Sequence, residues 1–172
     1  MASLMENIIE ILNKENEEYE LLIGLSREKT PIIIKGDLEG LATITEKEQE
    51  VVARIRKLET KRIQVTKDIA EVTNQKPEDI KIPVLIEMMR TRPAEHDQLT
   101  EIHDKLKQTM AAMVKVNEQN RELLKNSMEM VDFEINLLQS MTRAPQTNDY
   151  NKGAYNTGAI MGSGTKLFDA KQ

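Results

Sequence analysis

The chain has 172 residues, a formal net charge of −5, 31% charged residues and only 3% aromatic residues. Because lysine and arginine are mixed with glutamate along the chain, no basic surface for phosphate groups is expected, which argues against nucleic-acid binding. The chain has no cysteine, which excludes disulfides, thiolate chemistry and metal sites built on cysteine.

The first twenty residues do not resemble a signal peptide. They become acidic where a secretory signal needs a basic start followed by a long apolar run. No later stretch approaches the roughly twenty apolar residues that would span a bilayer. We therefore expect a soluble cytoplasmic protein without membrane insertion.

A first helix is predicted over residues 3–34, where aliphatic residues recur at heptad-like spacing. Pro31 lacks an N–H group and its ring presses on the preceding turn, so a kink or an early end is expected near Lys29. Next comes a predicted turn, in which Gly36 takes a positive φ and Asp37 caps the following helix. So short a connection makes the first two helices antiparallel neighbours.

The second predicted helix carries an apolar seam of about thirty residues that contains no glycine after Leu41 and no proline. Its positions alternate in steps of three and four, which is the spacing of one stripe on a helix. Only Glu48 and Arg62 interrupt the seam, whose aliphatic members are Leu41, Ile44, Val51, Ile55, Leu58, Val65, Ile69 and Val72. So narrow a stripe must be buried against other helices. The helix is expected to end near Asn74.

Residues 77–89 are predicted to form a short helix or helical turn that reverses the chain. The longest helix then opens at residues 92–95 and runs to about Met141. The predicted fold is all-α: an elongated antiparallel helical bundle or coiled coil of three principal helices with a short connecting helix. This bundle domain is expected to occupy residues 1–144.

The last helix carries more apolar residues than one seam requires. Its main stripe contains Leu99, Ile102, Leu106, Met110, Met113, Leu124, Met128, Val131, Ile135 and Leu138. Phe133 and Leu137 lie outside this stripe, and an exposed apolar excess usually marks a binding surface. Methionines suit such a surface because they are adaptable, although they suit a core equally well. Asn117 and Asn120, beside the stripe, either specify the pairing register or bond across to another helix.

Residues 145–172 are expected to form a flexible, glycine-rich C-terminal tail, because they cannot bury enough apolar surface to offset the entropy of ordering. This stretch nevertheless holds two of the three tyrosines and a Leu167–Phe168 pair. Such side chains are suited to docking. Tyr150 in particular combines an apolar ring with a polar hydroxyl group and has little rotamer freedom.

No pattern for catalysis or for a cofactor emerges. His96 and His103 are seven residues apart, whereas two ligands of one metal on a single helix prefer a spacing of three or four. The Gly-Ser-Gly-Thr-Lys run at residues 162–166 lacks the strand and helix that a phosphate loop requires. We therefore predict a protein that is not an enzyme and that holds no metal and no cofactor.

The order of several segments resembles the FlgN family of flagellar export chaperones. The matching segments are Asn16–Leu22, Lys35–Glu39 followed by Thr45–Glu48, Asn117–Leu124, Tyr150 with Gly153, and the closing Leu167–Asp169. The resemblance implies a cytoplasmic chaperone of type III export. Proteins of this family bind the hook-filament junction proteins, prevent their premature assembly and deliver them to the cytoplasmic domain of the export gate.

The resemblance and the apolar excess together place client binding on the last helix. The predicted client-binding residues are Asn117, Asn120, Leu124, Met128, Val131, Ile135 and Leu138. By resemblance, Tyr150 and Gly153 are the export-gate docking residues. A different interpretation is a structural coiled-coil adaptor that acts through homo-oligomerisation, and weak self-association is compatible with both. The two differ in stoichiometry, because an adaptor would bury the same patch in a symmetric dimer.

Overall fold

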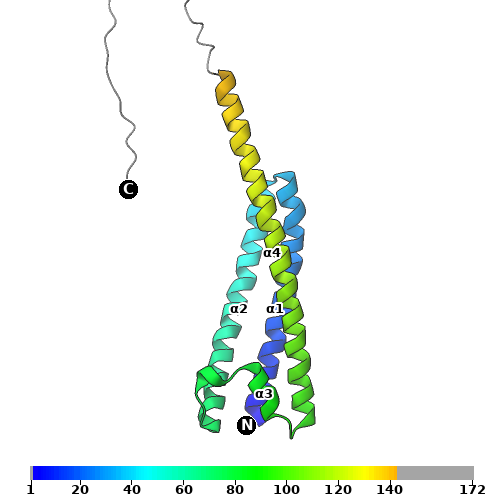
Figure 1. Cartoon of the computed structure of the whole chain (residues 1–172), viewed down its shortest axis with the longest axis vertical. Coiled ribbons are helices and arrows are strands. Elements are labelled where there is room, and N and C mark those ends of the chain that lie inside the picture. The colour runs from blue at the N-terminus through cyan, green and yellow to red at the C-terminus, as the bar shows by residue number, and fades with distance from the viewer. Residues whose placement is uncertain (1, 143–172) are drawn as a thin grey trace, which may run out of the picture.

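The computed structural model describes residues 2–142, and these form an elongated, all-helical molecule (Figure 1). Its elements in order are α1 (Ala2–Lys35), α2 (Leu38–Thr73), the 3₁₀ turn η1 (Pro77–Asp79), α3 (Ile82–Met88) and α4 (Pro93–Thr142). Within these residues there is no strand. The predicted all-α bundle of three principal helices with a short connecting helix is confirmed. The tail predicted over residues 145–172 lies outside the described residues.

The turn between α1 and α2 has the predicted chemistry. Gly36 adopts a φ of 66°, which a residue with a side chain rarely does. The N–H of Gly40 donates to Oδ1 of Asp37 over 2.9 Å, so Asp37 caps α2. At the other end of α2, Asn74 has a φ of 55°, and its N–H faces the carbonyls of Ala70 and Glu71. Both ends of α2 are therefore determined by local sequence.

Of the kink or early end expected near Lys29, the early end is wrong, because α1 continues through Pro31 to Lys35. Proline removes a single backbone donor from the helix. Contacts on both sides of it hold the chain in place: the Thr30 hydroxyl donates to Asn120 on α4 over 2.6 Å, and Ile33 is buried. Tertiary contacts thus outweigh the local preference of Pro31.

Helix α1 is the central element of the bundle. It packs along both α2 and α4, whereas α2 and α4 have few direct contacts with each other. The main core lies at the end where α3 closes the molecule, and it joins side chains of α1, α2, α3 and α4. A smaller cluster of Leu22, Val51 and Ile55 lies between α1 and α2. The core therefore thins toward the α1–α2 turn.

The seam of α2 packs as predicted over most of its length. Ile44, Val51, Ile55 and Ile69 are buried, while Val72 at the end of the helix is 59% exposed. The two polar interruptions are paired with α1, as Glu48 lies 2.8 Å from Nζ of Lys29 and Arg62 lies 3.0 Å from Glu15. These ion pairs let charged residues occupy the seam without an unpaired charge.

Helix α4 runs parallel to α1 and extends well beyond it (Figure 1). Two polar contacts define the register: Thr109 donates to Asn16 over 2.8 Å, and Asn120 donates to the Ser26 carbonyl over 2.6 Å. This register places Lys35, the last residue of α1, about level with Met128. Every residue of α4 from 126 to 142 is exposed, and we call this segment the exposed end of α4.

Candidate partner-binding site

The stripe of α4 that packs against the bundle continues along the same face into the exposed end. Leu99 and Ile102 are buried in the main core, and Leu106 is packed against it. Farther along, steps of three and four on the same face define a segment that we call the client stripe: Leu124, Met128, Val131, Ile135 and Leu138. From Met128 onward α1 no longer runs beside this face, so no other helix within residues 2–142 covers the stripe.

The exposed end of α4 is apolar to an unusual degree for a surface helix. Eight large apolar side chains between Met128 and Met141 are 46–74% exposed. They are Met128, Met130, Val131, Phe133, Ile135, Leu137, Leu138 and Met141. Scattered exposed apolar residues are normal, but a contiguous patch of this size marks an interaction surface.

The client stripe begins in a groove at the α1–α2 turn, which we call the terminal groove. Its volume is about 500 Å³. Ile33 near the end of α1 and Leu38 and Leu41 of α2 line one side, and the opposite side is formed by Leu124, Ser127, Met128 and Val131 of α4. Leu38 is 80% exposed although it starts a helix beside apolar neighbours. A helix lying on the client stripe would enter the terminal groove and cover Leu38.

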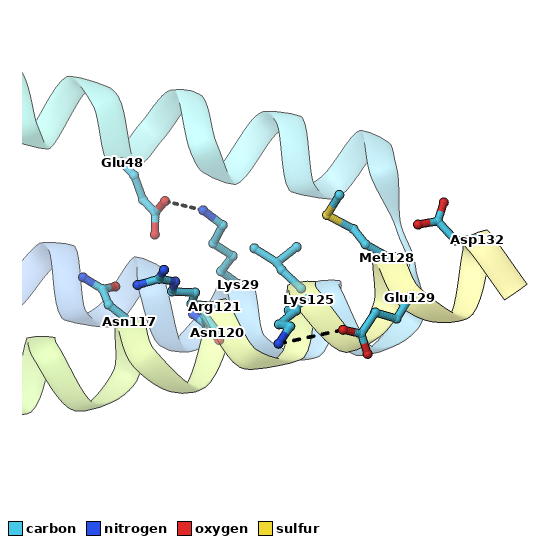
Figure 2. Close-up of a pocket in the computed structure, with 10 residues that line it drawn as sticks. Lys29, Glu48, Asn117, Asn120, Arg121, Lys125, Met128, Glu129 and Asp132 are labelled. Atoms are coloured by element: carbon cyan, nitrogen blue, oxygen red, sulfur yellow. Dashed lines mark hydrogen bonds and ion pairs between the residues drawn. The ribbon is translucent and has the colours of Figure 1, made fainter. Parts of the chain in front are cut away.

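A second hollow, the polar cleft, lies next to the terminal groove and has a volume of about 560 Å³. Figure 2 shows side chains from α1, α2 and α4 converging there. Glu48 accepts from the Ser26 hydroxyl over 2.9 Å and pairs with Lys29, and Lys125 lies 3.8 Å from Glu129 across one turn of α4. Asn117 and Arg121 also line the cleft. The cleft therefore offers polar contacts beside the apolar stripe.

The two asparagines predicted for client binding lie in different environments. Asn117 is exposed and lines the polar cleft. Asn120 is 5% exposed, its Nδ2 donates to the Ser26 carbonyl, and its Oδ1 accepts from the Thr30 hydroxyl. Asn120 thus combines the two roles considered for it, because its bonds across to α1 also define the register of α4 on α1. Its side chain is satisfied inside the bundle, so we do not keep it among the client contacts.

Some of the site was missed by the sequence reasoning. Leu38 and Leu41 belong to the terminal groove, but Leu38 precedes the periodic part of α2 and Leu41 had been assigned to the seam. The bonds of Ser26 and Thr30 to Asn120 likewise have no local signature, since about ninety residues separate the partners. Only the packing of α4 on α1 reveals these contacts.

The two histidines of the chain lie on α4. The Nδ1 atoms of His96 and His103 lie 3.1 and 3.3 Å from Oδ1 of the aspartate that follows each of them. Within residues 2–142, no three histidine, aspartate or glutamate side chains are grouped to hold a metal ion. In that same part of the chain, no helix is both long and apolar enough to cross a membrane. Tyr150 and Gly153, predicted to dock on the export gate, lie outside the described residues.

In the part of the chain that the structure describes, the longest helix of this all-α protein leaves an apolar stripe exposed, and such a surface suits an amphipathic partner helix. The FlgN protein family matches residues 1–157, and the chain therefore belongs to the FlgN family of flagellar export chaperones. A protein of Bacillus subtilis (strain 168), described as "Uncharacterized protein YvyG", is 28% identical over 165 residues, which cover 95% of this chain and 96% of that protein. No solved structure matches the chain. The resemblance inferred from the sequence is confirmed.

Proposed function

We propose that this protein is a cytoplasmic type III export chaperone for flagellar hook-filament junction proteins. It binds a helical segment of the client, prevents premature assembly and delivers the client to the cytoplasmic domain of the export gate. Membership of the FlgN family supports the chaperone class, which is not an enzymatic one. The observation that carries the client site is the client stripe, which continues past the end of α1 with its side chains exposed.

The proposed contact is a helix laid in a groove. An amphipathic client helix would place its apolar face on Met128, Val131, Ile135 and Leu138, with one end in the terminal groove against Leu38. Full burial of each such side chain stabilises a complex by about 1.5–3 kcal/mol before the cost of association. The polar cleft would meet the hydrophilic side of the same helix through Asn117 and Arg121.

The proposal is tested with the double variant Val131→Ser/Ile135→Ser. We expect the dissociation constant for a junction protein of the same organism to rise at least about tenfold, or about 1.4 kcal/mol. The helicity and the melting temperature should stay unchanged, because both side chains lie on the exposed end of α4. Isothermal titration calorimetry and circular dichroism measure the two properties.

Asn136→Ser is the matched control, since Asn136 is exposed on the same helix and faces away from the client stripe. It should bind the client as the wild type does. Unchanged affinity in the double variant, with normal binding by the wild type, would remove the client stripe from the mechanism.

Homo-oligomerisation of an adaptor remains a different proposal for the same patch. The charges of the exposed end disfavour it, because residues 126–142 contain Glu129, Asp132 and Glu134 but no lysine or arginine. Pairing two copies through this segment would bring carboxylates together. Light scattering on the free chain separates the two proposals, since an adaptor would be dimeric without any client.

A further inference from the structure

The exposed end of α4 carries a second apolar stripe that the client stripe does not include. We call it the second stripe, and it consists of Met130, Phe133, Leu137 and Met141. All four side chains are exposed, and they follow one another in steps of three and four. At 3.6 residues per turn, this stripe lies roughly 130° around the helix from the client stripe.

The second stripe becomes continuous and exposed where α1 ends. Along the earlier part of α4 the same face carries mainly exposed polar residues, Glu101, Gln108, Lys115, Gln119 and Asn126, with the half-buried Ala112 and Leu123 among them. Along that part of α4 the long neighbour is α1, while α3 packs near the start of α4, and one apolar stripe faces the bundle. From Met130 onward the helix has two apolar stripes, which is the pattern of a helix with two helical neighbours.

One helix cannot cover both stripes. A partner helix buries an apolar arc of about 100° or a little more on the helix it contacts. The two stripes together span more than half of the circumference of α4, so a single client helix would leave either Met128 and Val131 or Phe133 and Leu137 in water. Covering both requires two helices.

Carboxylates flank each stripe. Glu134 lies between the two stripes, Asp132 borders the far side of the client stripe, and Glu129 borders the far side of the second stripe. Residues 126–142 contain no lysine or arginine. In paired helices, the residues beside the apolar seam select a partner of opposite charge. The complementary helices would therefore carry lysine or arginine beside their apolar faces.

We propose that the exposed end of α4 is held between two amphipathic helices of one client molecule, each with basic residues beside its apolar face. In this complex α4 occupies the central position that α1 occupies in the bundle. The inference rests on the proposed chaperone function and deepens it, because it defines the client segment as a pair of helices. Glu134 faces both of them.

The test compares two double variants of the full chain, Val131→Ser/Ile135→Ser on the client stripe and Phe133→Ser/Leu137→Ser on the second stripe. The probe is a full-length hook-filament junction protein of the same organism, titrated by calorimetry. We expect each double variant to raise the dissociation constant at least about tenfold and the quadruple variant to abolish measurable binding. Asn136→Ser, which lies on neither stripe, should change the dissociation constant less than twofold.

A charge reversal tests the flanking residues. Glu134→Lys should raise the dissociation constant at least about tenfold at low salt, and the difference from wild type should shrink as salt is added. Glu118→Lys makes the same change on an exposed position of α4 outside both stripes and should leave binding within twofold. Equal effects of the two reversals would overturn the assignment of basic flanking residues.

The outcomes separate this inference from the proposed function. If only the client-stripe variant loses binding, the client supplies a single helix and the inference is overturned, while the chaperone proposal stands. If neither variant loses binding, the inference and the placement of client binding on this helix are both overturned.

A free chain that is dimeric in light scattering and becomes monomeric with Phe133→Ser would assign the second stripe to a second copy. Tighter client binding by a chain ending at Thr142 would assign it to the chain's own tail. Both results overturn the inference.

Discussion

Asn120 is a polar residue whose role is set by two atoms of α1. Its amide donates to the Ser26 carbonyl and accepts from the Thr30 hydroxyl, both over 2.6 Å, in a position that is 5% exposed. Together with the Thr109–Asn16 bond, this contact fixes how far α4 slides along α1. The position of the client stripe relative to the end of α1 therefore depends on two buried polar contacts.

Replacing Asn120 should cost stability. Asn120→Ala leaves the Thr30 hydroxyl without its partner on α4 and opens a small space, so we expect a loss of about 1–3 kcal/mol in the free energy of unfolding. Asn117→Ala, at an exposed position one turn earlier, should stay within about 0.5 kcal/mol. Urea titrations followed by circular dichroism measure the stability of both variants. Equal stabilities would show that the contact of Asn120 with α1 contributes nothing.

Glu15 predicts a dependence of stability on pH. Its carboxylate is 4% exposed, and burial raises its pKa above the ordinary value of 4.5, although Arg62 at 3.0 Å acts in the opposite direction. A raised pKa in the folded state means that folding favours the protonated acid. This contribution to stability is present below pH 4.5 and is lost as the pH rises through the raised pKa.

Glu15→Gln isolates this effect. The stability of the wild type relative to the variant should fall as the pH rises from 4.5 toward neutrality, because glutamine does not ionise. Urea midpoints of both proteins, recorded at several pH values, give the difference directly. A difference that grows with pH would mean that the ion pair with Arg62 outweighs burial.

At the scale of the helices, local sequence determined most boundaries. The cap at Asp37, the positive φ of Gly36 and the paired prolines around residues 77–83 act within a few residues, so the pattern alone predicted three long helices and a short connector. Pro31 was misjudged for the opposite reason. What keeps α1 helical there is a hydrogen bond to Asn120, ninety residues away, and the burial of Ile33.

The seam of α2 can be tested with a charge. Ile55 is 5% exposed and packs with Leu22 of α1, so Ile55→Asp would place a carboxylate inside an apolar cluster and should cost several kcal/mol. Ile63→Asp, on the same helix at a position that is 53% exposed, should have a small effect. Thermal unfolding distinguishes them, and equal melting temperatures would show that the seam is drawn on the wrong face.

At the scale of the whole molecule, the candidate site arises from unequal helix lengths. The sequence showed that the last helix had more apolar residues than one seam needs, and this excess led to the client-binding prediction. It did not show that α1 ends level with Met128, or that Leu38 and Leu41 would form a groove with α4. Those facts depend on the register between helices, which side-chain contacts across the bundle determine and which periodicity does not encode.

The proposed function implies a second contact, and we propose that the segment after α4 makes it. A chaperone that delivers a bound client to the export gate would hold both partners at the same time, so the proposed gate contact lies away from both stripes of α4. Tyr150 follows the end of α4 by eight residues and was predicted as the docking residue. A tyrosine buries an apolar ring, satisfies its hydroxyl group and loses little rotamer entropy, which suits a single-residue anchor.

Tyr150→Ala should therefore separate docking from client binding. We expect unchanged thermal stability and client affinity, weaker binding to the cytoplasmic domain of the export gate, and reduced export of the junction proteins. Tyr155→Ala, which removes the same type of side chain five residues later, serves as the matched control and should retain gate binding. A stability loss above about 1.5 kcal/mol would place Tyr150 in the packing of the bundle. Gate binding at the wild-type level by the Tyr150→Ala variant would refute the docking role, because a single-residue anchor leaves no other side chain to replace it.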